Sequence, residues 1–288
     1  MGVGAKYLMG SYGFVPEDLC TVRLLCSGFL TLLISLVTGN GIGLHFFKDK
    51  KNVFGFLLVG TFILSSQFTF MQSVMLSTAG TATILLTTVP LWAAAWVAIT
   101  EHKPVRKIEI FCFFLATIGV IFIVTKGNFG SLDMPILGVL WALFSAMLSA
   151  GYTIESRGVI MRTSVFAVIG WGMLFGGLIS SFFSPPWSLH GTFTWESSLT
   201  FAYVVFFGTV VAFNCYMAGL KYISAVVAGL LVCTEPLFAY IFQAILLDET
   251  VGLVEFFGIL LILFNVLLLG MPDKFINRFT RRFNKNAA

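Results

Sequence analysis

Hydrophobic residues recur in long runs along the whole chain, and short polar connections separate them. Nine runs reach the length of a membrane span, because ~20 apolar residues in a helix cross a hydrocarbon core of ~30 Å. We expect spanning helices at 18–38, 53–74, 79–100, 108–125, 135–155, 164–184, 197–219, 225–247 and 252–270. Segment 1–11 is also apolar but covers about half that thickness. We interpret it as part of a tenth helix and expect the natural chain to begin ~15–20 residues upstream.

The connections between the runs differ in charge. Lysines and arginines gather in every second connection and in the segment 271–288, whereas the opposite connections contain Lys126 and several acidic residues. Cytoplasmic loops of membrane proteins are enriched in Lys and Arg. We therefore expect a multi-pass protein of the cell membrane with a cytoplasmic C-terminus and with external loops at 126–134, 185–196 and 248–251.

Composition supports this interpretation. Hydrophobic residues make up 58% of the chain and charged residues 10%, and the mean hydropathy of +0.96 excludes a soluble domain of 288 residues. The runs are much longer than the short alternating strands of a membrane β-barrel. The fold class is therefore an all-α polytopic membrane protein whose surroundings are the lipid bilayer, and the basic loops give no reason to expect nucleic acid. The cysteines and histidines lack metal-ligand spacing, so no metal, disulfide or cofactor is expected.

The segment 225–247 contains a single ionisable residue, Glu235, directly before Pro236. A carboxylate at bilayer depth costs ~2.5–3.5 kcal/mol on insertion scales, so it should face protein or water. The proline lacks an N–H group and frees the carbonyl of Val232. We expect Glu235 to bind a proton or a substrate; the alternative is a structural partner that holds a kinked helix.

The same stretch has an internal counterpart 146 residues earlier. This offset superimposes Thr88, Pro90, Leu91 and Glu109 on Thr234, Pro236, Leu237 and Glu255. The offset spans five helices, and an odd number inverts the second copy in the membrane. We predict a ten-helix bundle of two inverted five-helix repeats, at 1–126 with the first helix truncated and at 134–270, followed by a basic cytoplasmic tail at 271–288. Pro90 and Pro236 are the expected helix kinks.

Other polar and aromatic residues within the spans are weaker candidates. Lys6 is a counter-ion for Glu235 or for a substrate carboxylate, or it snorkels to the outer interface. Arg23 is expected to anchor the outer end of its helix or to pair with Glu17 or Asp18, and a role in substrate binding is the alternative. The remaining candidates either line a cavity or form ordinary interhelical contacts: Thr88, Thr234, Gln67, Asn214, Trp141 and Tyr152.

This pattern resembles the drug/metabolite transporter superfamily, EamA type. The resemblance rests on Pro16 and Arg23, on Pro90 in TVPLWAAAWVAITE, and on EPLFAYIFQAILLDET followed by Gly258. It implies ten helices in two inverted halves and the export or exchange of small metabolites, often amino acids. The chain departs from the family pattern at its shortened first helix. It also departs from the pattern at the ends of the two proline-containing helices, because Glu101 and Glu249 lie at different sequence distances from Pro90 and Pro236.

We therefore expect a secondary transporter that moves a small metabolite such as an amino acid by alternating access. Glu235 could couple this transport to protons. The expected assembly is a monomer or a weak homodimer. The alternatives are an intramembrane enzyme, a channel, and a receptor or non-transporting scaffold. The chain has no His-Glu-x-x-His motif, no Gly-x-Ser-x-Gly motif and no carboxylate pair at catalytic spacing, so an enzyme is not expected.

Overall fold

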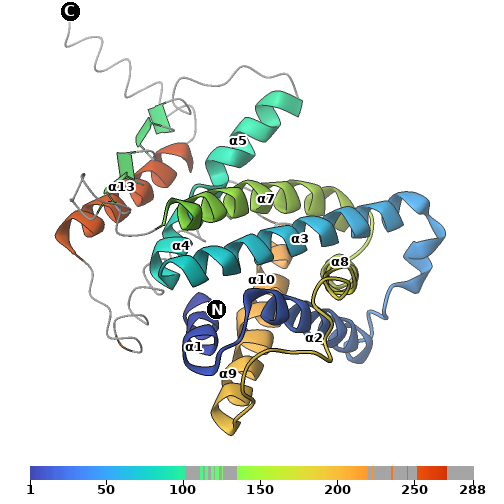
Figure 1. Ribbon diagram of the computed structural model, residues 1–288. Helices are drawn as coiled ribbons and strands as arrows, with labels where there is room; N and C mark the ends of the chain where they lie inside the picture. Colours follow the sequence, from blue (N-terminus) through green and yellow to red (C-terminus); the bar gives the residue numbers. More distant parts are fainter. Residues whose placement is uncertain are drawn as a thin grey trace, which may run out of the picture.

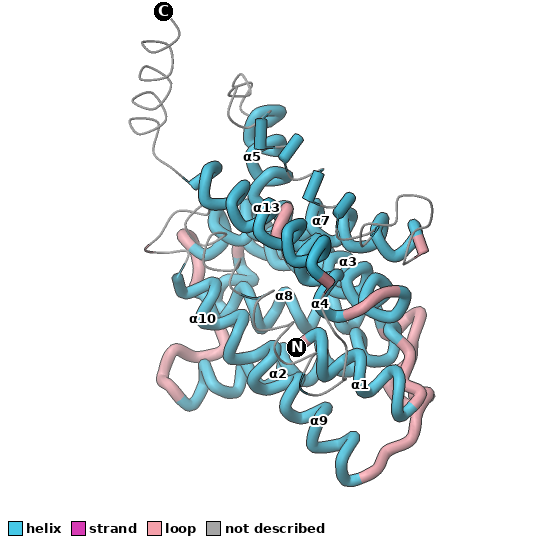
Figure 2. Tube along the Cα trace, turned by 90° about the vertical axis from the view of Figure 1, so that its left-hand side faces the viewer, coloured by secondary structure: helices cyan, strands magenta, loops and turns pink. Residues whose placement is uncertain are grey.

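The computed structural model describes residues 1–100, 135–219 and 252–270, together with isolated residues of 111–125 and Tyr222, Glu235 and Ile245. Every regular element in this part of the chain is a helix (Figure 2). Five of the helices are long and apolar enough to cross a membrane. The prediction of an all-α polytopic membrane protein is confirmed to that extent.

The first 100 residues form five α-helices and one short 3-10 helix (Figure 1). Their bounds are α1 Gly2–Tyr12, α2 Pro16–Val37, η1 Leu44–Lys48, α3 Lys50–Leu76, α4 Ala79–Leu86 and α5 Val89–Thr100. Local signals explain where they begin: α2 has a proline in its first turn, and the side chains of Asp49 and Thr78 cap α3 and α4. The expected spans at 18–38, 53–74 and 79–100 therefore correspond to helices.

The described part of the second half also consists of helices. Its described elements are α7 Ile136–Ile160, α8 Val165–Ser180, α9 Trp195–Val205, the π-helical segment η2 Phe206–Val211, α10 Ala212–Gly219 and α13 Leu253–Gly270. The helix α7 continues five residues beyond the expected end at 155, whereas α9, η2 and α10 follow one another as a single rod. The expected spans 108–125 and 225–247 and the tail 271–288 fall largely or wholly outside the described residues.

The expected span 79–100 is interrupted. Thr87 and Thr88 form a turn between α4 and α5, and their hydroxyl groups donate to the carbonyls of Ile84 and Leu85 at 2.6 and 2.8 Å. Pro90 then occupies the first turn of α5, where a proline is tolerated. The kink expected at Pro90 is therefore realised just before it, and α5 continues past α7 toward the top of the view in Figure 1.

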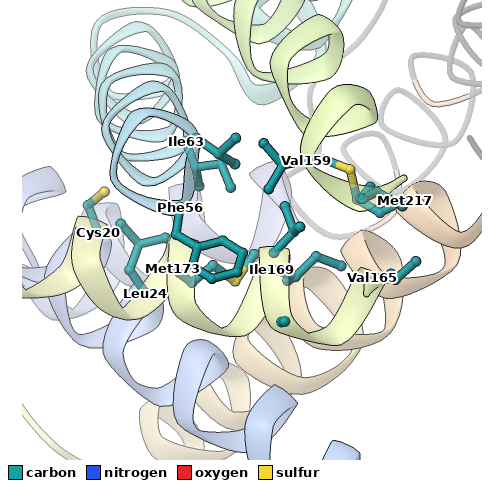
Figure 3. Packing of buried hydrophobic residues seen from close by; sticks show 13 residues of the cluster. Cys20, Leu24, Phe56, Ile63, Val159, Val165, Ile169, Met173 and Met217 are labelled. Atoms are coloured by element: carbon teal, nitrogen blue, oxygen red, sulfur yellow. The ribbon is translucent and has the colours of Figure 1, made fainter. Parts of the chain in front are cut away.

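The helices α2, α3, α7 and α8 pack around the largest hydrophobic core, with Met217 of α10 at its edge (Figure 3). Glycines bring the backbones close together. A Cβ atom at Gly28 would lie 2.8 Å from the backbone nitrogen of Leu174, and a Cβ atom at Gly60 would lie 2.5 Å from the carbonyl oxygen of Gly172. In the absence of a hydrophobic driving force between helices in lipid, such close approach is a main source of helix association.

The connection between α1 and α2 lies beside the connection between α8 and α9. The backbone nitrogen of Thr192 donates to the carbonyl of Tyr12 at 2.9 Å. The buried carboxylate of Asp18 accepts hydrogen bonds from Ser184 Oγ at 2.5 Å and from the backbone nitrogen of His190 at 2.6 Å. The α8–α9 connection is one of the loops expected outside the cell, and these contacts place the α1–α2 connection at the same end of the bundle.

Candidate functional site

A cavity of about 240 Å³ lies among α3, the junction of α4 and α5, α7, and the rod of η2 and α10. Its volume is several times the ~30 Å³ that a water molecule occupies in the liquid. Apolar and aromatic side chains alternate with polar ones around the wall, which is the usual composition of a small-molecule site. The lining residues are Met1, Ser66, Gln67, Phe70, Leu86, Thr87, Val89, Pro90, Ser145, Ser149, Tyr152, Thr153, Gly208, Ala212, Phe213, Tyr216 and Glu235.

Serines join α3 to α7 along one wall of the cavity. The hydroxyl groups of Ser66 and Ser149 lie 2.6 Å apart, and Ser145 Oγ donates to the carbonyl of Ser66 at 2.8 Å. None of these three serines was predicted from the sequence, because isolated serines are common in membrane helices. The available signal was the four-residue spacing of Ser145 and Ser149, which places both hydroxyl groups on one face of α7.

Gln67 lines the cavity and is held from behind by Arg23. The Arg23 guanidinium is buried, with 1% of its surface exposed, and its Nη2 donates to Gln67 Oε1 at 2.6 Å. The expectation that Arg23 anchors the outer end of α2 or pairs with Glu17 or Asp18 is wrong. Glu17 instead accepts from Gln72 and Asp18 accepts from Ser184, whereas Arg23 turns into the bundle toward α3.

Glu235 is among the lining residues, and its side chain is exposed there. Met1 and Tyr152 line the same cavity. Of the neighbouring candidates, Pro90 lines the same cavity, whereas Thr234 and Pro236 lie outside the described residues. The carboxylate and Gln67 therefore contribute polar groups to one space from segments far apart in the sequence.

Four predicted site residues are not among those that line this cavity. Lys6 Nζ donates to the carbonyls of Val74, Met75 and Ser77 at the end of α3, at 3.0, 3.2 and 2.6 Å. Thr88 donates to its own helix, and Asn214 Nδ2 donates to Val210 O and to Thr31 Oγ1, at 2.8 and 3.3 Å. Trp141 packs edge-on against Phe68. Gln67 and Tyr152 are the predicted polar and aromatic candidates on described helices that do line the cavity.

Residues separated by the 146-residue offset meet at the cavity. The lining includes four such pairs, Ser66 with Ala212, Gln67 with Phe213, Phe70 with Tyr216, and Val89 with Glu235. The close approach of α2 and α8 occurs at another pair, Gly28 with Leu174. The π-helical segment η2 ends beside Ala212, and its Gly208 also lines the cavity. Such segments are frequent at functional sites.

Comparisons with known proteins show which proteins this chain is similar to. The model of the EamA-like transporter family matches residues 136–271. An uncharacterized inner membrane transporter, YicL, of Salmonella typhimurium is 30% identical over 274 residues, covering 95% of this chain and 91% of that protein. An uncharacterized transporter of Clostridium kluyveri is 24% identical over 250 residues, 84% of this chain and 80% of its own. A solved crystal structure with 15% identity aligns with a TM-score of 0.62 over 93% of this chain and 94% of its own, which shows a shared fold.

Proposed function

The chain belongs to the EamA-like transporter family of the drug/metabolite transporter superfamily, and we propose that it moves a small metabolite through the central cavity by alternating access. It is a multi-pass membrane transporter rather than an enzyme. The proposal concerns what the transporter carries and how. An amino acid is the substrate type that we favour, with export or exchange across the cell membrane by a monomer or weak homodimer.

The observation that carries the proposal is the lining of the cavity by offset-matched residues from both halves of the chain. Two inverted repeats place their shared site near the middle of the membrane at the interface between them. The pairs Phe70 with Tyr216 and Val89 with Glu235 line one cavity, which supports that architecture. Rocking one half against the other would then open the same cavity to each side in turn. The close contact between Gly28 and Leu174 supports a pivot between α2 and α8.

Glu235 is the residue to which we assign coupling. Its counterpart Val89 lines the same cavity without a charge, so the fold of this cavity wall does not require a carboxylate at the repeated position. A carboxylate inside a membrane is retained where it has a function, because its desolvation is costly. We propose that Glu235 exchanges a proton, or binds the amino end of a substrate, as the cavity changes sides. Leu86 lines the cavity, and we expect its carbonyl, opposite Pro90, to face the same space, whereas Val232 lies outside the described residues.

The proposed function is tested by transport. A comparison of metabolites inside and outside overexpressing cells identifies the substrate, and proteoliposomes containing the purified protein then report its uptake. We expect Glu235→Gln, which keeps the shape and removes the titration, to insert normally but to lose at least ~90% of transport or to lose its pH dependence.

Glu155→Gln is the matched control, because Glu155 lines a separate pocket with Lys50 and Arg162 toward the C-terminal end of α7. Transport by Glu235→Gln at the parent rate between pH ~5.5 and ~8 would remove Glu235 from the mechanism.

A further inference from the structure

We infer that the cavity contains a subsite for a carboxylate, formed by the side-chain amide of Gln67 and positioned by Arg23. The inference rests on the proposed function and names the chemistry of one end of its substrate. It assigns to Arg23 a positioning role: the guanidinium does not line the cavity, and it acts through the amide that does.

The orientation of the amide follows from the chemistry of its partner. A guanidinium has five N–H donors and no acceptor. The atom of Gln67 that lies 2.6 Å from Arg23 Nη2 must therefore be the carbonyl oxygen Oε1. The amino group Nε2 then points away from Arg23, and it makes no hydrogen bond to any side chain or backbone group in the described part of the chain. Since Gln67 lines the cavity, this amino group is a free donor at its wall.

Arg23 supplies the charge behind this donor. Its Nε atom has no hydrogen-bond partner, and none of the described carboxylates forms an ion pair with it. A buried charge without compensation is costly. The hydrogen bond to Oε1 also polarises the amide, because linked hydrogen bonds strengthen one another in a medium of low dielectric. An anionic oxygen at Nε2 would complete the chain from guanidinium to amide to ligand and would compensate the charge.

The counterpart positions of Gln67 and Arg23 do not repeat this pair of residues. The offset takes Gln67 to Phe213, an aromatic residue of the same cavity, and takes Arg23 to Ile169, a buried residue of the hydrophobic core. The donor group therefore comes from the first half of the chain and the carboxylate of Glu235 from the second. A ligand with a carboxylate near Gln67 and a cationic group near Glu235 matches both walls, whereas a carboxylate near Glu235 would be repelled.

The experiment uses two thiol reagents as probes of the cavity. The five native cysteines are replaced by alanine, and a single cysteine is introduced at Ser149, which faces Ser66 across the wall next to Gln67. Purified protein in detergent is treated with an anionic sulfonatoethyl methanethiosulfonate or a cationic trimethylammonioethyl methanethiosulfonate. The sulfonate resembles the proposed carboxylate, and the ratio of the two modification rates reports the preference of the site.

We expect Arg23→Met to lower the anionic-to-cationic ratio on the order of tenfold, because the charge behind the amide is lost. Gln67→Glu keeps a partner for Arg23 and therefore keeps the fold, but it replaces the free donor by an acceptor, and we expect a similar or larger fall. If Arg23→Met does not fold, Gln67→Glu decides alone. Thr61→Ala, on an exposed face of α3, is the control and should leave the ratio unchanged.

A ratio that is unaffected by Gln67→Glu would overturn the subsite. This measurement needs no transport, so its outcome is separate from that of the proteoliposome assay. Protein that transports without the rate preference would refute the carboxylate subsite alone. Protein that shows the preference but moves no metabolite would refute the transport proposal and leave the subsite standing.

Discussion

The ammonium group of Lys6 closes the C-terminal end of α3 by donating to three backbone carbonyls there. The last carbonyls of a helix lack partners within it and carry the negative end of its dipole, so a lysine with three donors suits this place. The residue had been a candidate counter-ion in the site, but these contacts give it a structural role at the end of the bundle.

Replacement of Lys6 by Met tests that role. Methionine keeps much of the apolar stem but removes the donors, and we expect a loss of roughly 1–3 kcal/mol in stability, since hydrogen bonds to charged groups contribute about that much. Thermal unfolding of the purified protein measures it, with Lys6→Arg as the control that retains a cation. Weakened substrate binding by Lys6→Met at unchanged thermal stability would instead return Lys6 to the transport site.

The candidate residues show what a sequence reveals at this scale. Glu235 and Pro90 stood out because a carboxylate and a proline are rare within apolar spans, and both line the cavity. Arg23 carried an equally strong signal but was placed at the helix end, because the sequence does not show that α3 presents Gln67 to it. The contact between Ser66 and Ser149 depends on how α3 and α7 face each other, which the amino-acid sequence alone does not specify.

At the scale of elements, α3 and α8 approach each other through glycines. A Cβ atom at Gly60 would lie 2.5 Å from the carbonyl oxygen of Gly172 and 3.3 Å from the backbone nitrogen of Gly176. Backbone atoms cannot turn aside as a flexible side chain can, so a methyl group here must push the helices apart. Gly172 and Gly176, four residues apart on α8, therefore serve close helix packing within the bundle.

We therefore expect Gly60→Ala to destabilise the protein by about 1–3 kcal/mol, the usual cost of overpacking. Gly158→Ala is the matched control, because nothing lies within 4 Å of a Cβ atom there and alanine is the better helix former by ~1 kcal/mol. Thermal unfolding in detergent should thus move the two variants in opposite directions. Equal melting temperatures would mean that α3 and α8 are not in backbone contact.

The ends of the helices were easier to predict than their interruptions. Apolar runs and capping residues such as Asp49 and Thr78 are local, so the bounds of α3 and α4 follow from neighbouring letters. The sequence predicts a kink at Pro90, because the missing backbone donor of a proline is also a local signal, and the structure has a turn just before it, at Thr87 and Thr88. The π-helical segment Phe206–Val211 had no such signal, and the packing that accommodates its additional residue is a property of the bundle.

At the scale of the whole molecule, the bundle has two different ends. One end joins the α1–α2 connection to the α8–α9 connection through Thr192 and Tyr12 and through Asp18 and His190. The other end contains Lys50, Lys51 and Arg162, which surround one pocket with Glu155. This separation matches the charge pattern of the sequence, in which basic connections alternate with acidic ones. The charge bias of short loops sets the orientation of a membrane protein.

The orientation can be tested with single cysteines in a cysteine-free variant and a membrane-impermeant thiol reagent. Ser188 is exposed in the α8–α9 connection, and Lys50 is exposed at the basic end of α3. We expect Ser188→Cys to be labelled in intact cells, whereas Lys50→Cys and Ala288→Cys should react only after the membrane is opened. Labelling of Ala288→Cys but not of Ser188→Cys in intact cells would reverse the orientation. Labelling of both Ser188→Cys and Lys50→Cys would refute the inverted arrangement, because the acidic and the basic end of the bundle would then lie on the same side of the membrane.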